Sequence, residues 1–124
     1  MSRRIFPDFP SLVEGTADYI AGLAVTAIAE SGRFTIALSG GNTPKPVYAR
    51  LAQAPYVQRI DWSRVHVFFG DERCVPPDDV RSNYHMARIT LLEHVPIPPA
   101  NIFRMMGEEG ESGIINYCYK ATLI

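Results

Sequence analysis

Apolar residues recur at helical spacing through the first part of the chain. Steps of three and four residues place five of them on one helical face: Val13, Ala17, Ile20, Ala24 and Ile28. The S-x-x-E capping-box pattern at Ser11 and Glu14 predicts where this helix begins. Gly32 predicts where it ends, because glycine is the usual residue just past a helix C-terminus.

Two short apolar runs further along the chain are typical of buried strands. The first is Phe34–Leu38, and the second is Val65–Phe69, whose continuous apolar character fits a strand covered on both faces. A second helix is predicted between them, with four residues on its buried side: Val47, Tyr48, Leu51 and Ala52. Residues 102 to 105 are a candidate third strand.

A third helix is predicted after the second strand, with Ser82 as its cap. Its inward residues are Tyr84, Ala87, Leu91 and Leu92. Residues 107 to 113 read as a polar, acidic loop. The alternation of helices and strands predicts an α/β fold, in which a parallel sheet with flanking helices is joined by right-handed crossovers. We expect one domain over residues 1 to 124.

The turn after the first strand combines features of an anion site. Adjacent Gly40 and Gly41 let the backbone pass close to a ligand, and a helix N-terminus offers free N–H groups and partial positive charge. Thr43 is a good N-cap, and Pro44 suits the first helical position. A phosphate is the most plausible anion. The stretch is neither a P-loop nor a G-x-G-x-x-G fingerprint, so it predicts no nucleotide. A turn that merely joins strand to helix is the alternative.

Polar residues also follow the second strand, at Asp71, Glu72 and Arg73. Ligands of open parallel sheets bind beyond the carboxyl ends of the strands, so neighbouring strands would bring the two loops into one crevice. Arg73 could then bind a phosphate as a bidentate donor. Asp71 could accept hydrogen bonds from sugar hydroxyls or hold Arg73 in place. The alternative is a surface ion-pair cluster that contributes little energy.

Net charge and cysteine content limit the classes of binding partner that the chain is expected to have. The 124 residues carry a net charge of −1, so no basic footprint argues for nucleic acid. Cys74 and Cys118 lie far apart without metal-ligand spacing, which predicts free thiols in a reducing compartment and no metal site. No apolar run is judged long enough to span a membrane. We therefore expect a soluble cytoplasmic protein without nucleic-acid or membrane partners.

Other residues with reactive side chains are weaker candidates. His66 lies between valines and is expected in the core or on a sheet face, His85 is expected to be exposed, and His94 lies near a helix C-terminus. None is placed with a nucleophile and an orienting carboxylate, as a catalytic triad requires. Lys45 could add charge to the anion loop or be solvated. Cys74 follows an arginine that could lower its pKa, but packing is the better interpretation.

Three motifs occur in an order that resembles the 6-phosphogluconolactonase family. They are Leu-Ser-Gly-Gly-Asn-Thr-Pro at 38 to 44, Asp-Glu-Arg-Cys-Val-Pro at 71 to 76 and Arg-Ser-Asn-Tyr at 81 to 84. The resemblance runs from about residue 34 to residue 104. The related glucosamine-6-phosphate deaminases share the Ser-Gly-Gly loop but carry a tyrosine where this chain has Arg73. Arg73 and the following Val75-Pro76 favour the lactonase branch.

This resemblance implies a Rossmann-like fold of the sugar-phosphate isomerase/lactonase type. The implied reaction is hydrolysis of 6-phospho-D-glucono-1,5-lactone to 6-phospho-D-gluconate in the oxidative pentose phosphate pathway, without metal or organic cofactor. The implied substrate- and phosphate-binding residues are Ser39, Gly40, Gly41, Asn42, Thr43, Asp71 and Arg73. Ser82 and Asn83 would support the second loop.

The chain also departs from the family. Members are about twice as long, and their catalytic histidine, in a Gly-His-Thr segment, and a phosphate-binding lysine lie in the second half. No Gly-His-Thr occurs here, so no catalytic residue is secure, and residues 111 to 124 form an atypical tail. The fold thus looks truncated. We expect weak or no activity and self-association through an unpaired sheet edge. A non-catalytic phosphosugar-binding fragment and a deaminase-like enzyme are the alternatives, and the oligomeric state is open.

Overall fold

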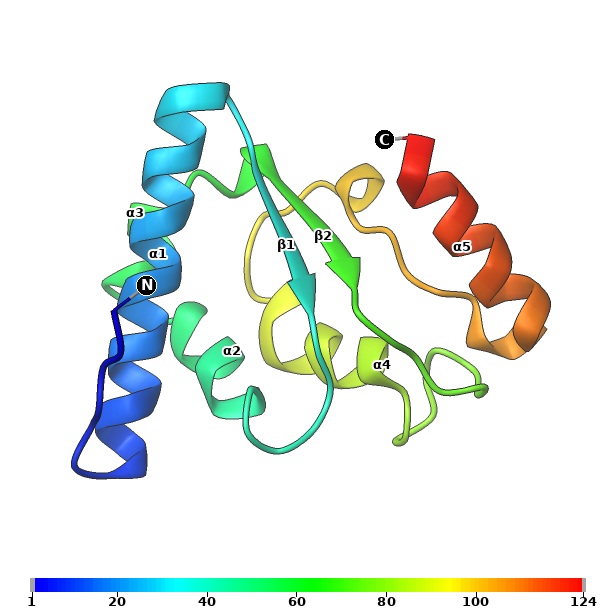
Figure 1. Cartoon of the computed structure of the whole chain (residues 1–124), viewed down its shortest axis with the longest axis horizontal. Coiled ribbons are helices and arrows are strands. Elements are labelled where there is room, and N and C mark those ends of the chain that lie inside the picture. Colours follow the sequence, from blue (N-terminus) through cyan, green and yellow to red (C-terminus); the bar gives the residue numbers. More distant parts are fainter. Residues whose placement is uncertain (1, 124) are drawn as a thin grey trace.

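The computed structural model describes the backbone of residues 2 to 123 and the side chains up to residue 117. Its helices and strands follow in the order α1 (Phe9–Ser31), β1 (Phe34–Leu38), α2 (Lys45–Leu51), α3 (Tyr56–Arg59), β2 (Val65–Phe69), α4 (Asn83–Ala87) and α5 (Glu111–Leu123). In Figure 1, α1 lies on the β1 side of the strand pair and α5 lies on the β2 side. The predicted α/β class is confirmed.

The two predicted strands are present and parallel, in a register that runs from Phe34 opposite Val65 to Leu38 opposite Phe69. The prediction of a third strand over residues 102 to 105 was wrong, because only one residue of this segment pairs with β2. Ile102 makes a single parallel bridge to Val67, and the Phe103 N–H donates to the Val67 C=O at 2.9 Å. A 3₁₀ turn ends just before this segment and a tight turn follows at residue 105, so too few extended residues remain for a strand.

Strand β2 is covered less evenly than its apolar sequence predicts. Val65, Val67 and Phe69 are buried, whereas His66 and Phe68 on the other face are only half-buried. His66 is therefore a sheet-face residue, as one of the two expectations had it. The expectation of a strand fully covered on both faces was wrong for these described residues.

Helix α1 begins earlier than its capping-box pattern predicts. Asp8 is the N-cap, and its Oδ1 accepts a hydrogen bond from the Ser11 N–H at 2.8 Å. Pro10 is tolerated because it lies in the first turn, where its missing N–H costs nothing. The Glu14 side chain binds Arg50 instead of capping the helix. The predicted end at Gly32 is confirmed by its φ of 82° and by the bond from its N–H to the Ile28 C=O.

Helix α1 is also, among the described residues, the one helix long and apolar enough to cross a membrane by length and composition. The expectation that no run reaches that length was therefore wrong. Core helices of soluble proteins and signal sequences near an N-terminus pass the same test, so a single such helix is weak evidence for a membrane span. Two ion pairs attach α1 to the rest of the domain, Glu14 to Arg50 at 2.7 Å and Asp18 to Arg59 at 2.9 Å. Three of its alanines are completely buried: Ala17, Ala21 and Ala24.

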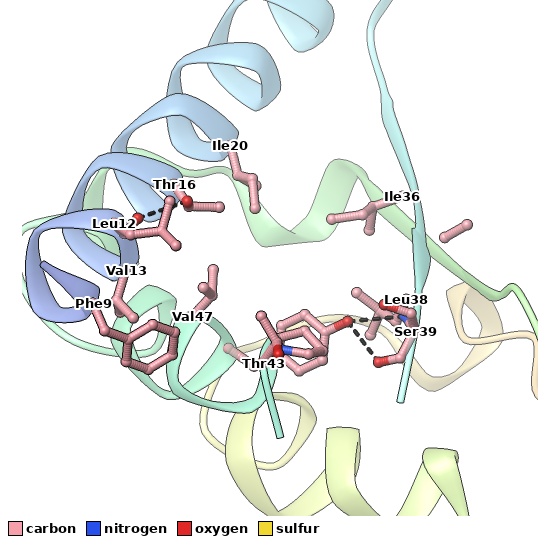
Figure 2. A pocket seen from close by; sticks show the side chains of 13 residues that line it. Phe9, Leu12, Val13, Thr16, Ile20, Ile36, Leu38, Ser39, Thr43 and Val47 are labelled. Atoms are coloured by element: carbon pink, nitrogen blue, oxygen red, sulfur yellow. Dashed lines mark hydrogen bonds between the residues drawn. The ribbon is translucent and has the colours of Figure 1, made fainter. Parts of the chain in front are cut away.

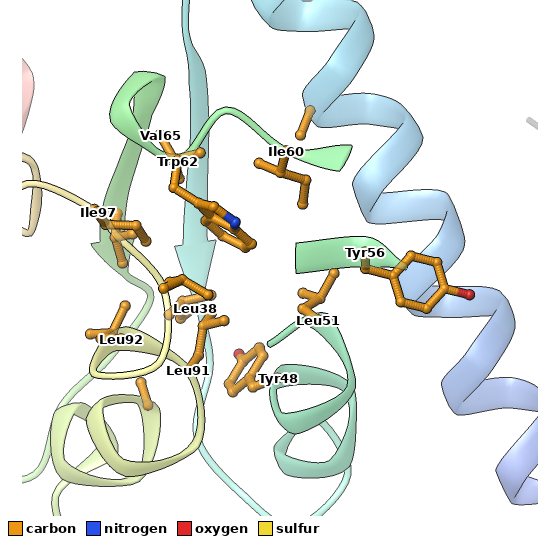
Figure 3. Close-up of a cluster of buried hydrophobic side chains, with 14 of the residues drawn as sticks. Leu38, Tyr48, Leu51, Tyr56, Ile60, Trp62, Val65, Leu91, Leu92 and Ile97 are labelled. Atoms are coloured by element: carbon orange, nitrogen blue, oxygen red, sulfur yellow. The ribbon is translucent and has the colours of Figure 1, made fainter. Parts of the chain in front are cut away.

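The core lies between the strands, helix α1 and the helices that follow the strands (Figure 3). Six of the eight predicted inward positions of the second and third helices are buried: Val47, Tyr48, Leu51, Ala87, Leu91 and Leu92. The other two, Ala52 and Tyr84, are half-buried and pack against the core. Trp62 is buried among them, and its indole N–H donates to the Val57 C=O at 2.9 Å, so its polar atom is satisfied. Ser82 caps α4 as predicted, and the helix continues as a π-helical turn, Arg88–Leu92.

The predicted acidic loop at residues 107 to 113 is more regular than expected. A 3₁₀ turn, Gly107–Glu109, precedes α5, and Arg104 forms an ion pair with Glu108 at 2.6 Å. This pairing lowers the pKa of Glu108 to about 2. The division into one partial domain with an atypical tail from residue 111 stays a prediction.

Strand β1 has a neighbouring strand on one side only, within the part of the chain that the structure describes. Its other edge can pair with a second chain. We expect self-association that grows with concentration and that Ala37→Lys weakens, because this exposed residue would place a charge on the open edge. Sedimentation velocity over a concentration series measures the effect, with Thr26→Lys on the exposed face of α1 as control. Equal association in both variants would argue against this edge as the contact.

Candidate functional site

The two polar loops leave the sheet side by side. Leu38 and Phe69 are opposite each other at the ends of the parallel strands, and the Gly70 N–H donates to the Leu38 C=O at 3.0 Å. The strands are thus neighbours, as the hypothesis of a shared crevice requires. Residues 39 to 43 and 71 to 75 both begin at this carboxyl edge, where open parallel sheets bind ligands.

The two glycines of the first loop are required for different reasons. Gly41 has a φ of 97°, in the left-handed region that side chains rarely adopt. Gly40 packs directly on Asn83, and a side chain at position 40 would overlap the Asn83 amide. Ser39, Asn42 and Thr43 are exposed. The loop therefore places an open backbone next to the second loop.

The predicted cap of the following helix was wrong. Helix α2 begins at Lys45, Pro44 occupies the cap position with helical φ and ψ, and no described side chain caps the helix. Pro44 extends a turn before the helix, so Thr43 lies too early to act as its cap. A helix of only seven residues sums few peptide dipoles. Anion binding would thus depend on the glycine turn itself.

Asn83 connects the two loops. It is buried, with 5% of its surface exposed, although it carries a polar side chain. Its Nδ2 donates to the Asp71 Oδ1 at 3.1 Å and lies 3.2 Å from the Asp71 C=O. The same amide lies against Gly40 of the first loop. One side chain therefore links both loops at the carboxyl edge of the sheet.

Glu72 holds the second loop to α4, a role that the sequence did not suggest. Its carboxylate accepts hydrogen bonds from the Ser82 hydroxyl at 2.8 Å, the Asn83 N–H at 2.7 Å and the Tyr84 N–H at 3.0 Å. The Arg73 N–H donates to it as well, at 2.8 Å. An acidic residue suits the free N–H groups of a helix start. The predicted helix start at Ser82 was the signal in the sequence that could have suggested an acidic partner such as Glu72.

The side chain of Arg73, unlike its backbone N–H, takes no part in these contacts. Its side chain is exposed, and among the described residues its guanidinium has no hydrogen-bond or ion-pair partner. Its backbone carbonyl packs on Gly107, where any side chain would collide with it. No ion pair among the described residues involves Asp71, Glu72 or Arg73, so the alternative of a surface ion-pair cluster is wrong. The guanidinium is available to an anion.

The rings of the three histidines make no hydrogen bond to Gly40, Asp71 or Asn83 in the described part of the chain, although the His85 backbone N–H donates to the Ser82 hydroxyl at 3.1 Å. His85 is half-buried rather than exposed, and the His94 ring lies 2.8 Å from the Ile89 C=O near the helix end. Lys45 is exposed. Cys74 is an exposed free thiol, whereas the side chain of Cys118 lies outside the described residues.

The third motif has its own ion pair. Arg81 binds Asp79 at 2.9 Å, and the hydrogen bonds from Arg81 lower the pKa of Asp79 to about 2. This arginine is therefore already paired with a carboxylate that stays ionised at neutral pH. Arg73 remains the better arginine for a phosphate.

A cavity of about 540 Å³ lies between α1, β1 and α2 (Figure 2). We call it the α1–β1 groove. Ser39 and Thr43 are the predicted site residues that line it, and most of its other residues are apolar. Apolar walls suit hydrophobic groups better than a phosphate dianion. Gly40, Asp71 and Asn83 do not line the groove, so it borders the turn at Ser39 and Thr43 without containing the polar junction.

Comparison with known proteins identifies the family. The family described as glucosamine-6-phosphate isomerases/6-phosphogluconolactonase matches residues 7–122, beyond the stretch from 34 to 104 that carries the motifs. A 6-phosphogluconolactonase of Nostoc sp. is 48% identical over 98 residues, which are 79% of this chain and 39% of that protein. A probable chloroplastic 6-phosphogluconolactonase 3 of Oryza sativa subsp. indica is 41% identical over 119 residues, 94% of this chain and 36% of the relative.

Solved structures show the same relation. The 6-phosphogluconolactonase of Thermotoga maritima superposes with a TM-score of 0.80 at 28% identity, over 89% of this chain and 49% of that one. A monomeric glucosamine-6-phosphate deaminase reaches a TM-score of 0.82 at 19% identity, which shows a common fold alone. This chain spans half or less of the length of these relatives. It belongs to the glucosamine-6-phosphate isomerase/6-phosphogluconolactonase family.

Proposed function

We propose that this chain forms the phosphosugar-binding half of a 6-phosphogluconolactonase. The reaction is hydrolysis of 6-phospho-D-glucono-1,5-lactone to 6-phospho-D-gluconate in the oxidative pentose phosphate pathway. The observation that carries the proposal is the junction in which Asn83 links Gly40 to Asp71 at the carboxyl edge of two parallel strands. The names of the relatives support a phosphorylated lactone as the substrate.

The proposal gives each loop a role. Backbone N–H groups of the turn from Gly40 to Thr43 bind the phosphate, as successive N–H groups in turns do in other anion sites, and the exposed Ser39 adds its hydroxyl. The unpaired Arg73 guanidinium adds a bidentate, charge-assisted contact. Asp71 accepts hydrogen bonds from sugar hydroxyls, and Ser82 and Asn83 support its loop. Neither metal nor organic cofactor takes part, and the location is the cytoplasm.

A phosphosugar-binding role without efficient catalysis is the second candidate. Lactone hydrolysis needs a general base to activate water and donors to stabilise the oxyanion. A missing general base typically costs about 10²–10⁴ in rate. The observation that favours this candidate is that, in the described part of the chain, no histidine ring is hydrogen-bonded to Gly40, Asp71 or Asn83 of the junction.

Replacing Arg73 by alanine tests the proposed phosphate contact. We expect 6-phosphogluconate to bind the wild-type chain and to bind Arg73→Ala about tenfold to a hundredfold more weakly, because a hydrogen bond to a charged group contributes about 1.5–3 kcal/mol. Isothermal titration calorimetry measures both affinities. Arg33→Ala, at the opposite end of β1, is the control, and gluconate is the ligand without phosphate. Equal binding of gluconate, or no effect of Arg73→Ala, would contradict the phosphate role.

Two activity assays distinguish a lactonase from a binding fragment and from a deaminase. Lactone hydrolysis, corrected for the spontaneous reaction, distinguishes an enzyme from a binding fragment. Turnover well above buffer that Arg73→Ala abolishes would establish a complete active site in this chain. Ammonia release from glucosamine 6-phosphate would instead favour the deaminase.

A further inference from the structure

One tyrosine hydroxyl binds both backbone groups of the first residue of the glycine turn. The Tyr48 hydroxyl accepts a hydrogen bond from the Ser39 N–H and donates one to the Ser39 C=O, each at 2.9 Å. The dashed lines at Ser39 in Figure 2 mark these bonds. The Leu38 C=O faces β2, where it binds the Gly70 N–H. Backbone groups alternate along a strand, so those of Ser39 face the open edge of β1, and the hydroxyl replaces a neighbouring strand there.

The ring of Tyr48 is fixed by the core. Tyr48 is buried, with 4% of its surface exposed, in the same cluster as Leu51 and Leu91 (Figure 3). Burial raises the pKa of Tyr48, so the hydroxyl keeps the proton that it donates to Ser39. Tyr48 belongs to α2, the helix that follows the turn. Its hydroxyl therefore ties the start of the turn to the helix at its end.

The same arrangement recurs at the second loop. The Tyr117 hydroxyl accepts a hydrogen bond from the Phe69 N–H at 2.8 Å and donates one to the Phe69 C=O at 3.1 Å. Phe69 is the residue opposite Leu38 in the sheet. Both loops of the junction thus start from backbone that a tyrosine hydroxyl holds.

We infer that Tyr48 is a positioning residue of the phosphosugar site, and that its hydroxyl keeps the Ser39–Gly41 backbone in the conformation that binds the phosphate. The inference rests on the proposed function. Ser39 is exposed, so water replaces the hydroxyl when it is removed. Removal of the hydroxyl is therefore expected to make the turn less ordered and to lower the stability of the fold only slightly.

Replacing Tyr48 by phenylalanine removes only this hydroxyl. We expect the Ser39 amide to exchange its hydrogen about threefold to tenfold faster and the affinity for 6-phosphogluconate to fall by a similar factor, since one neutral hydrogen bond is lost. NMR-detected hydrogen exchange and calorimetry measure the two effects. The Val67 amide reports on the sheet and should exchange at the wild-type rate. Tyr19→Phe, an exposed tyrosine of α1, is the matched control.

The outcomes distinguish a positioning role of Tyr48 from a merely structural one. Unchanged exchange at Ser39 overturns the inference, and so does faster exchange with unchanged affinity. Faster exchange at both Ser39 and Val67 shows a general loss of stability and overturns it too. If the wild-type chain does not bind 6-phosphogluconate, the proposed function fails. Hydrogen exchange at Ser39 would then still show whether the Tyr48 hydroxyl orders the turn.

Discussion

Replacing Glu72 by alanine is expected to lower the free energy of unfolding by about 3 kcal/mol, since hydrogen bonds to a charged group contribute about 1.5–3 kcal/mol each and do not add in full. The carboxylate accepts bonds from Ser82, Asn83 and Tyr84, all at the start of α4. Two of these donors belong to buried residues, Ser82 and Asn83. Loss of the carboxylate would leave them without partners and detach the second loop from the helix.

Urea unfolding followed by the fluorescence of Trp62, the single tryptophan, measures this change. Glu72→Gln should fall between alanine and wild type, because its amide oxygen can accept while its NH₂ group faces the remaining donors. Glu30→Ala, at an exposed position near the end of α1, is the control and should change little. A Glu72→Ala protein as stable as the control would show that solvent replaces these bonds at no cost.

Replacing Gly40 by alanine is expected to cost about 2 kcal/mol of stability, as overpacking of a tight contact typically does. The new Cβ would overlap the amide of Asn83, which must then move and give up its hydrogen bond to Asp71. Because this contact links the two loops, we also expect the affinity for 6-phosphogluconate to fall roughly tenfold, which corresponds to about 1.4 kcal/mol. Urea unfolding and calorimetry measure the two effects.

Gly22→Ala is a matched control for this substitution. A Cβ at position 22 of α1 meets no atom within 4 Å, so alanine should stabilise the helix by about 0.5–1 kcal/mol. The double variant Gly40→Ala/Asn83→Ala relieves the overlap and should recover part of the stability but none of the affinity. If Gly40→Ala alone keeps full affinity, the link between the loops is not needed for binding.

Much of the fold follows from local patterns in the sequence. Both strands, the buried sides of the helices, the end of α1 at Gly32 and the cap at Ser82 all agree with the structure. Helical and strand periodicities act over a few neighbouring residues, so they are visible in one sequence. The prediction of a third strand failed because turns bound residues 102 to 105 and leave only the bridge between Ile102 and Val67. The start of α1 failed because Asp8 competes with Ser11 as a cap.

The sequence by itself determined that two polar loops follow two parallel strands and that the first loop has an adjacent pair of glycines. Only the tertiary structure decided how these loops are held: Asn83 packs on Gly40 and bonds Asp71, Glu72 anchors α4, and the Tyr48 hydroxyl binds Ser39. These contacts join residues 9 to 43 positions apart. Such hydrogen bonds depend on where folded elements come to lie in space, which no short-range periodicity encodes.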